Sequence, residues 1–189
     1  MVYVCPMLAY AAGVLRQLAT VVPPAPGRPE PLIDHPMRTV TRQVAFEPDG
    51  WTKERAAKVA ELFDGLAPEW HTRRGPESAL PLVDALDRGE PFPSGPTLEA
   101  GSGVGAFTAE IVARLDHVIA CDLSYEMLRR APAEQAPRCQ ADASALPFAD
   151  GTFGVVVLVN MLLFPREVAR VLRRDGTLVW VNTVGDATP

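Results

Sequence analysis

Hydrophobic and polar positions follow two different periods along this chain, and the change comes near residue 97. Before that point, apolar side chains recur at helical spacing in residues 51–66, and a second helix is expected over residues 78–88, ending at Gly89. After it, short apolar runs alternate with amphipathic stretches. The expected strands are residues 97–100, 117–122, 138–142, 154–160 and 177–184, and the expected helices between them are residues 104–115, 124–131 and 165–172.

Strands that alternate with helices, and that are apolar on both faces, are typical of a parallel sheet covered by helices on both sides. The fold class predicted here is therefore α/β, a doubly wound parallel sheet with an N-terminal helical cap. We divide the chain into an apolar N-terminal segment with a proline-rich linker (1–36), a helical cap or lid (37–96) and a ligand-binding core (97–189).

Residues 1–15 carry no charge, but Arg16 ends this run before it reaches the length of a membrane span. Pro6 interrupts the run and no basic stretch precedes it, which argues against a signal peptide. We expect a helix packed on the body of the protein or on a partner, unless the natural start lies near Met37. Six prolines in residues 23–36 predict an extended linker.

Three glycines, Gly101, Gly103 and Gly105, follow the first strand of the expected sheet. In doubly wound sheets ligands bind beyond the carboxyl ends of the strands, where this turn must lie. Glycine allows unusual φ values and leaves no Cβ between the backbone and a ligand. The turn therefore predicts a backbone cradle for a nucleotide-like molecule, with a tight turn made only for packing as the alternative.

Polar side chains close four successive strands and should gather at one rim of the sheet: Glu99, Asp122, Asp142 and Asn160. Asp122 lies 21 residues after Gly101, a position from which a carboxylate accepts hydrogen bonds from ribose hydroxyls. Asp142 is placed to accept from an adenine amine. A dinucleotide is the competing ligand, because residues 101–106 also satisfy G-x-G-x-x-A. Glu99 would repel its pyrophosphate, however, and the chain ends soon after the fifth strand.

Composition narrows the function further. The 189 residues are 48% hydrophobic, which suits one soluble domain with an appendage, and the net charge of -5 argues against a broad nucleic-acid surface. The three cysteines form no CxxC pair and are interpreted as reduced thiols of a cytoplasmic protein. Cys121 and Cys139 are expected as small buried groups in neighbouring strands. No cluster with metal-ligand spacing is present in the sequence.

Four segments, LEAGSGVG, ACDLSYEML, QADASALPFADGTFGVVV and ARVLRRDGTLVWVN, resemble the successive motifs of class I S-adenosylmethionine-dependent methyltransferases. The likeness is greatest to the small-molecule branch that includes quinone-biosynthesis enzymes, and it covers about residues 97–184. Residues 59–73 also resemble the helix and loop that cover the cofactor in this branch. The resemblance implies a Rossmann-like sheet of order 3-2-1-4-5 and S-adenosyl-L-methionine as cofactor.

The resemblance also implies a role for each motif residue. Those expected around the methionine end of the cofactor are Glu99, Gly101, Gly103 and Gly105. Those expected around its adenosine are Asp122 on the ribose, Leu123 against the adenine, and Asp142 with Ala143 at the adenine edge. Asn160 should lie beside the cofactor, at the mouth of the substrate cleft.

The chain departs from this family after its fifth strand. The family usually adds two further strands, which a chain that stops at Pro189 does not supply. The edge of the fifth strand would then be open, apolar and prone to aggregation. We expect the N-terminal segment, a second copy of the chain or a separate partner to cover it, unless the sequence is a fragment.

The expected activity is methyl transfer from S-adenosylmethionine to a small-molecule substrate, with no role for nucleic acid or a membrane. One alternative is a catalytically silent methyltransferase-like subunit that binds a partner. The other is an NAD-dependent oxidoreductase. His71 is a candidate catalytic base, against a solvated residue of the lid, and Trp70 is a candidate wall of the cleft.

Overall fold

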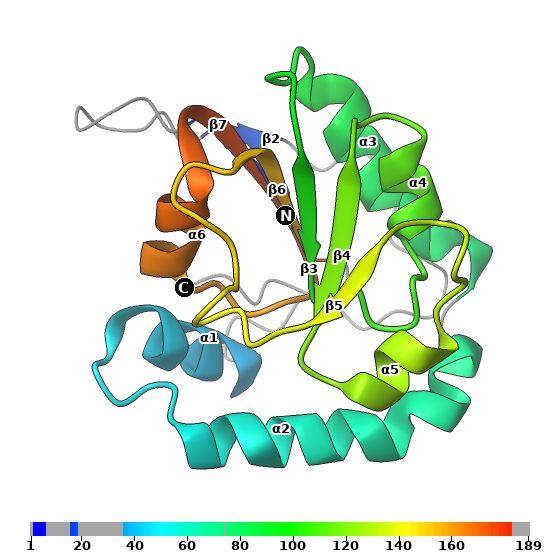
Figure 1. The fold of residues 1–189 in the computed structure, drawn as a ribbon, viewed down its shortest axis with the longest axis vertical. Helices are drawn as coiled ribbons and strands as arrows, with labels where there is room; N and C mark the ends of the chain where they lie inside the picture. The colour runs from blue at the N-terminus through cyan, green and yellow to red at the C-terminus, as the bar shows by residue number, and fades with distance from the viewer. Residues whose placement is uncertain (1, 7–15, 19–35, 74, 183–189) are drawn as a thin grey trace.

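A computed structural model describes residues 2–6, 16–18, 36–73 and 75–182. At its centre lies a seven-stranded sheet of order β2-β1-β7-β6-β3-β4-β5 (Figure 1). The strands are β1 Val2–Pro6, β2 Arg16–Leu18, β3 Thr97–Ala100, β4 Val118–Asp122, β5 Arg138–Gln140, β6 Phe153–Val159 and β7 Leu172–Val181. The helices are α1 Pro36–Phe46, α2 Lys53–Leu66, α3 Leu80–Gly89, α4 Thr108–Val112, α5 Tyr125–Arg130 and α6 Pro165–Val171.

The five strands β5, β4, β3, β6 and β7 pair in parallel. Numbered among themselves in chain order, they have the order 3-2-1-4-5, so the predicted fold is confirmed. The boundaries differ most at the last strand, which was expected to begin at residue 177. In the structure β7 begins at Leu172. The chain passes there directly from α6 to extended backbone, with no loop between them.

Both faces of the parallel sheet are buried, which is why its strands are continuous apolar runs. Alternate residues of β6 belong to different sides: Val155 and Val157 pack in one cluster with α3 and α4, whereas Val156 and Leu158 pack in another with α6. Every residue of β6 is buried. The sheet therefore separates two hydrophobic cores, and its functional groups can emerge only at its ends.

The predicted N-terminal helix is wrong for residues 2–6. These residues form β1, which pairs antiparallel with β7 from Val2 opposite Val181 to Pro6 opposite Thr177. The outer edge of β7 carries unpaired backbone donors and acceptors, and an apolar, β-branched segment satisfies them better as a strand than as a helix. β2 then pairs antiparallel with β1. Residues 7–15 and most of the proline-rich linker lie outside the described residues.

Three candidates were expected to cover the open edge of the fifth strand. In the structure the N-terminal segment covers it, because β1 pairs with β7. β1 and β2 stand at the end of the sheet where two strands of the resembling family were missing. They come from the opposite end of the chain.

Local signals fix the helices that lie near the carboxyl ends of the strands. Thr52 caps α2 by accepting a hydrogen bond from the Arg55 backbone, and Ser124 caps α5 by accepting from Met127. The helix expected over residues 104–115 is shorter, because Gly105 has a φ of +75° and the chain stays in a turn until Thr108. Helix α1 was not predicted.

Helices α1 and α2 run across the carboxyl ends of the central strands, beneath the sheet in Figure 1. Helix α3 lies elsewhere: its buried residues Leu82 and Leu86 pack against one face of the sheet. The part of residues 37–96 that overlies the rim is therefore α1 with α2, and we call residues 36–66 the cap.

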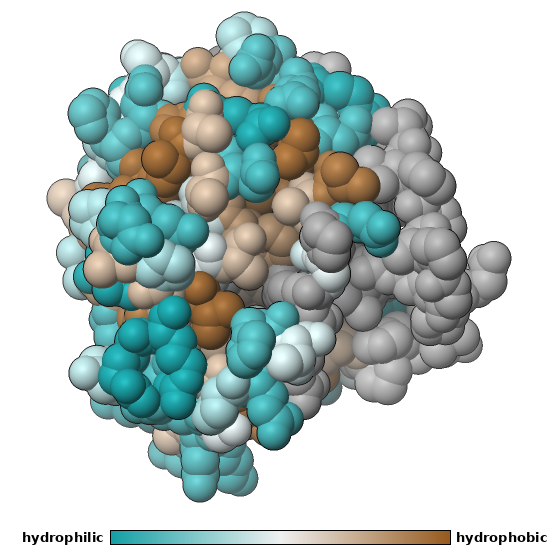
Figure 2. Space-filling view, turned by 90° about the vertical axis from the view of Figure 1, so that its right-hand side faces the viewer, coloured by the Kyte–Doolittle hydropathy of each residue, from teal (hydrophilic) through white to brown (hydrophobic). Residues whose placement is uncertain are grey.

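The face of the molecule in Figure 2 is mixed, with polar residues predominating and apolar residues in small separate groups. Ion pairs run along the outer surfaces of the helices, including Arg114 with Asp87 and Glu110, and Glu126 with Arg129. Within the described residues, no helix has both the length and the apolar character that crossing a membrane requires.

Candidate functional site

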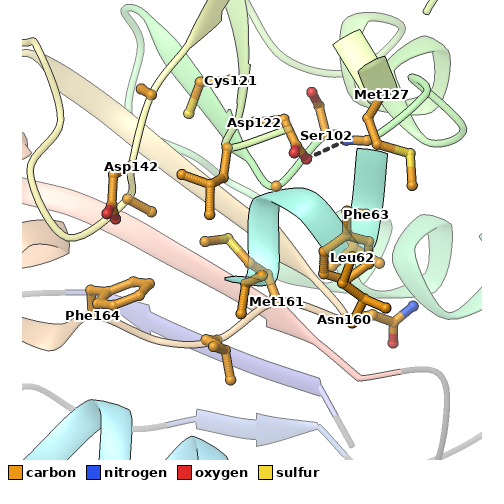
Figure 3. A pocket seen from close by; sticks show the side chains of 18 of the residues that line it. Leu62, Phe63, Ser102, Cys121, Asp122, Met127, Asp142, Asn160, Met161 and Phe164 are labelled. Carbon is orange, nitrogen blue, oxygen red and sulfur yellow. Dashed lines mark hydrogen bonds between the residues drawn. The ribbon is translucent and has the colours of Figure 1, made fainter. Parts of the chain in front are cut away.

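A cavity of about 490 Å³ lies between the cap and the carboxyl ends of the parallel strands (Figure 3). That volume lies within the usual range of small-molecule and cofactor pockets. Most of its lining surface is apolar. The cap lines it with Met37, Val40, Thr41, Trp51, Arg55, Val59, Leu62 and Phe63, and the 3-10 helix that follows, η1 Ala67–Arg73, adds Trp70. The core lines it with the glycine turn, the ends of β4 and β6, and residues that follow β4, β5, β6 and β7.

The glycine turn is held to the neighbouring strand by its backbone. The amides of Gly101 and Ser102 donate to the Cys121 carbonyl, at 2.8 and 3.0 Å. Gly101 and Gly103 line the cavity with φ values of +76° and +56°. A Cβ on Gly101 would lie 2.8 Å from Cγ and Sδ of Met161. Bare backbone therefore faces the cavity here, as the sequence predicts.

Asp122 ends β4 and lines the cavity beside this turn. Its Oδ2 accepts from the Gly103 amide at 2.8 Å, and its Oδ1 accepts from the Ser124 amide at 2.8 Å. Burial raises the pKa of the Asp122 carboxyl, and the two amide hydrogen bonds oppose that rise. Each oxygen keeps lone-pair capacity for a further donor from a ligand.

Asp142 lies two residues beyond β5 and also lines the cavity. Its Oδ1 accepts from the Ser144 amide at 2.8 Å. Both of its oxygens face the indole of Trp51, with Nε1 at 3.1 and 3.0 Å. The carboxylate assigned from sequence to an adenine amine thus also holds the cap in place.

Asn160 follows β6 at the cavity with a φ of +52°, and its side chain is exposed. The backbone amide of Asn160 donates to the Val181 carbonyl at 2.8 Å, which fixes the end of β6 against β7. The next residue, Met161, accepts from Nε1 of Trp180 at 3.1 Å through its carbonyl. Leu123 and Ala143 line the cavity as well, beside the two aspartates.

Three sequence candidates are not among the lining residues: Glu99, Gly105 and His71. Glu99 is 2% exposed and accepts a 2.6 Å hydrogen bond from Oγ1 of Thr108. Burial raises the pKa of this carboxyl to about 7. Glu99 therefore supports the first turn of α4 from behind the glycines, while His71 is exposed.

Most of the residues that attach the cap to the core, or that line the cavity from the cap, were not predicted from the sequence. Asp64 of α2 accepts from Oγ of Ser124 and, at 3.1 Å, from the Glu126 amide, so it caps α5 from outside. The rings of Trp51 and Phe164 meet edge to face, with centroids 5.2 Å apart. The helical period of residues 51–66 indicated an apolar face, and the resemblance of residues 59–73 to a covering helix and loop indicated its place.

Within the part of the chain that the structure describes, no group of three or more histidines, cysteines, aspartates or glutamates is arranged to hold a metal ion. What remains is an apolar cavity with a bare-backbone turn, two carboxylates and an amide at one side. Such a set suits an uncharged or cationic ligand with a nucleoside-like polar edge.

Comparisons with known proteins agree with this geometry. Residues 98–180 match a family described as a methyltransferase domain. The demethylmenaquinone methyltransferase of Mycolicibacterium vanbaalenii is 31% identical in an alignment of length 142, and the match covers 65% of this chain and 58% of that protein. The demethylmenaquinone methyltransferase of Corynebacterium kroppenstedtii is 26% identical in an alignment of length 137, and the match covers 67% of this chain and 60% of that protein. The chain thus spans less than two thirds of these relatives.

Among solved structures, DhpI in its complex with SAH superposes with a TM-score of 0.56 at 22% identity, covering 65% of this chain and 66% of that chain. At this level of identity the likeness concerns the fold.

Proposed function

We propose that this chain is a class I S-adenosylmethionine-dependent methyltransferase, which binds S-adenosylmethionine and transfers its methyl group to a small-molecule acceptor. The observation that carries the proposal is the meeting of three features in one cavity. The glycine turn, Asp122 at the end of β4 and Asp142 after β5 all line it.

The residues at this cavity fit an adenosyl cofactor. Gly101 and Gly103 present backbone without a side chain, which lets an extended ligand approach closely. The Asp122 oxygens accept only backbone hydrogen bonds from the described chain, so the 2′- and 3′-hydroxyls of a ribose can donate to them as well. The ring of Trp70 lies nearest to the open space beside Gly103, at 3.7 Å from a Cβ built there.

In our assignment Asp122 orients the ribose, Leu123 packs on the adenine, and Asp142 with Ala143 meets the adenine edge. The backbone of Gly101 and Gly103 lies along the methionine end of the cofactor. Glu99 and Gly105 support the turn without lining the cavity. Glu99 accepts a hydrogen bond from Thr108, and Gly105 adopts the positive φ that the turn requires. Asn160 stands where the acceptor would enter.

S-adenosylmethionine supplies a methyl group that is already activated by its sulfonium. The protein's part is then to hold the acceptor in line with the methyl carbon and to exclude water. The cap residues Val59, Leu62 and Phe63, with Met161 and Phe164 opposite, form apolar walls for that purpose. They favour a largely apolar acceptor, and demethylmenaquinone, named for the relatives, is the first compound to test. We assign no catalytic base.

We further propose that the protein acts in the cytoplasm, without nucleic acid. This rests on its composition, with a net charge of -5 and no CxxC pair.

The experiment is methyl transfer from cofactor carrying a labelled methyl group. Purified protein is incubated with it and with demethylmenaquinone or an organic extract of bacterial cells, and label in the small-molecule fraction is counted. We expect transfer by the wild type and by the control variant Asp116→Ala, because Asp116 is an exposed residue that precedes β4. Asp122→Ala should lose transfer. Cofactor binding without transfer to any acceptor would contradict the enzyme and favour the silent binding subunit.

A further inference from the structure

Two cysteine side chains lie next to each other on adjacent strands behind the glycine turn. Cys121 of β4 is in register with Cys139 of β5, and the strands are parallel, so both side chains point to the same face of the sheet. Both belong to the hydrophobic cluster on that face. Their thiols lie close enough for each to shift the pKa of the other. The sulfur of Cys121 is visible at the cavity in Figure 3.

The spacing of this pair is compatible with a covalent bond. Neighbouring strands run about 4.8 Å apart, and a disulfide joins residues whose Cα atoms are roughly 4.4–6.8 Å apart. A disulfide also needs Cβ atoms about 3.5–4.5 Å apart, slightly closer than neighbouring strands hold them, so the bond would draw β4 and β5 together at this point. The pair therefore differs from a lone buried cysteine, which has no second thiol to react with.

The two thiols differ in a way that gives each a separate part in such a reaction. Cys121 is buried, and the pKa of its thiol is raised by its hydrogen bond to Cys139 and by burial. Cys139 is partly exposed, and the same hydrogen bond lowers the pKa of its thiol to about 7. A partly exposed thiolate is the form that oxidants attack first, and a second thiol beside it can resolve the product.

The position of Cys121 connects this pair to the cavity. Its carbonyl accepts the amides of Gly101 and Ser102, so it anchors the glycine turn. The next residue is Asp122, which holds Gly103. A bond that pulls Cys121 toward β5 acts on the same backbone that shapes the ligand site.

We propose that Cys121 and Cys139 form an oxidisable dithiol site, in which a disulfide across β4 and β5 weakens ligand binding in the adjoining cavity. With hydrogen peroxide as oxidant, the Cys139 thiolate attacks one oxygen, the O–O bond breaks, and hydroxide leaves to become water as Cys139 becomes a sulfenic acid. The Cys121 sulfur then attacks that sulfur, the S–O bond breaks, and the departing hydroxide takes the Cys121 proton. Two thiols thus lose two electrons to the peroxide, which yields two waters.

The test uses the full chain with Cys5→Ser, so that no third thiol takes part. The protein is treated with hydrogen peroxide, digested with trypsin without reductant, and searched by mass spectrometry for residues 115–129 joined to residues 139–166. In parallel, its affinity for S-adenosylhomocysteine is measured before oxidation, after oxidation, and after dithiothreitol. The control is the same protein with Cys139→Ser as well.

We expect the joined peptide, an affinity that falls about fivefold or more on oxidation, and recovery with dithiothreitol. The control should show no joined peptide and no dithiothreitol-reversible change. A fall that dithiothreitol does not reverse would indicate methionine sulfoxide in the cavity and would overturn the proposal, as would a joined peptide with unchanged affinity. The affinity arm rests on the proposed function. If the reduced protein bound no S-adenosylhomocysteine, that function would fail, and the joined peptide would still decide whether the dithiol site exists.

Discussion

The two walls of the cavity are built by different means. On the core side, strand ends and the glycine turn are joined mainly through the backbone: the amides of Gly101 and Ser102 donate to the Cys121 carbonyl, and the Gly103 amide donates to the Asp122 carboxylate. On the cap side, the contacts to the core are made by side chains. The Trp51 indole donates to Asp142, and Asp64 accepts from Ser124. Only the core wall is therefore specified by the fold itself.

This difference has a consequence for function. Backbone hydrogen bonds in a buried sheet persist through most substitutions, whereas a side-chain contact is lost with a single one. We therefore assign recognition of the cofactor mainly to the core wall. The cap wall, joined to the core by side chains, is the part that we expect to open for exchange of ligands and to change its lining for another acceptor.

The largest effect is expected on the core wall, at Asp122. Asp122→Ala removes the ribose acceptor and leaves the Gly103 and Ser124 amides without their partner. We expect the affinity for S-adenosylhomocysteine to fall at least about 100-fold, or roughly 3 kcal/mol, measured by quenching of tryptophan fluorescence. Asp116→Ala should bind like the wild type. Equal affinity of the two variants would refute the assignment of the ribose to this residue.

The next effect concerns stability and pH. Burial raises the pKa of Glu99 from 4.5 in the unfolded chain to about 7 in the folded protein, so between these values the folded state holds a proton that the unfolded state has lost. Stability from this group is complete below pH 4.5 and declines as pH rises to about 7, by up to roughly 3 kcal/mol. Denaturant unfolding from pH 4 to 8 measures it.

In Glu99→Gln the amide cannot ionise and still accepts from Thr108, so this decline should be absent. Glu77→Gln, the same change at an exposed site, should follow the wild-type curve. Parallel pH curves for the wild type and Glu99→Gln would show that Glu99 is not the group responsible.

Two glycine-to-alanine substitutions, one in each wall, should change the free energy of unfolding in opposite directions. Gly101→Ala places a Cβ 2.8 Å from Met161 at a φ of +76°, and we expect it to lower the free energy of unfolding by about 1–2 kcal/mol. Gly65→Ala, in α2 of the cap with nothing within 4 Å, should raise it by about 0.5–1 kcal/mol. Changes of the same sign would contradict the account of the glycine turn.

The smallest effect is expected where the cap meets the core. Trp51→Phe keeps a ring against Phe164 but deletes the Nε1 donor to Asp142. We expect a loss of about 1 kcal/mol in the free energy of unfolding. The effect should be much smaller when Asp142→Ala is already present, because alanine has no oxygen to accept the indole N–H. Full additivity of the two substitutions would mean that the hydrogen bond does not hold the cap.

The sequence predicted the core wall well because its signals are local. A continuous apolar run marks β6, polar residues mark the ends of β4, β5 and β6, and Ser124 marks the start of α5. Residue spacing then sufficed to bring Asp122 and Asp142 to one rim, since parallel strands end at the same edge.

The cap wall and the sheet edge escaped prediction because they depend on partners far away in the chain. Trp51 and Asp142 are 91 residues apart, and nothing near Trp51 announces the contact. Residues 2–6 were interpreted as a helix since an uncharged run has no period that favours a strand. Only the unpaired edge of β7, at the other end of the chain, selects the extended form. Glu99 was expected at the cofactor, because its place in sequence does not reveal that Thr108 turns it inward.

The central claim is that the cavity between cap and core is shaped for an adenosyl sulfonium cofactor. Calorimetric titration of the purified chain with S-adenosylhomocysteine and, separately, with NAD tests it most directly. We predict one molecule of S-adenosylhomocysteine bound per chain and no heat of binding from NAD. Binding of NAD without binding of S-adenosylhomocysteine would contradict the account.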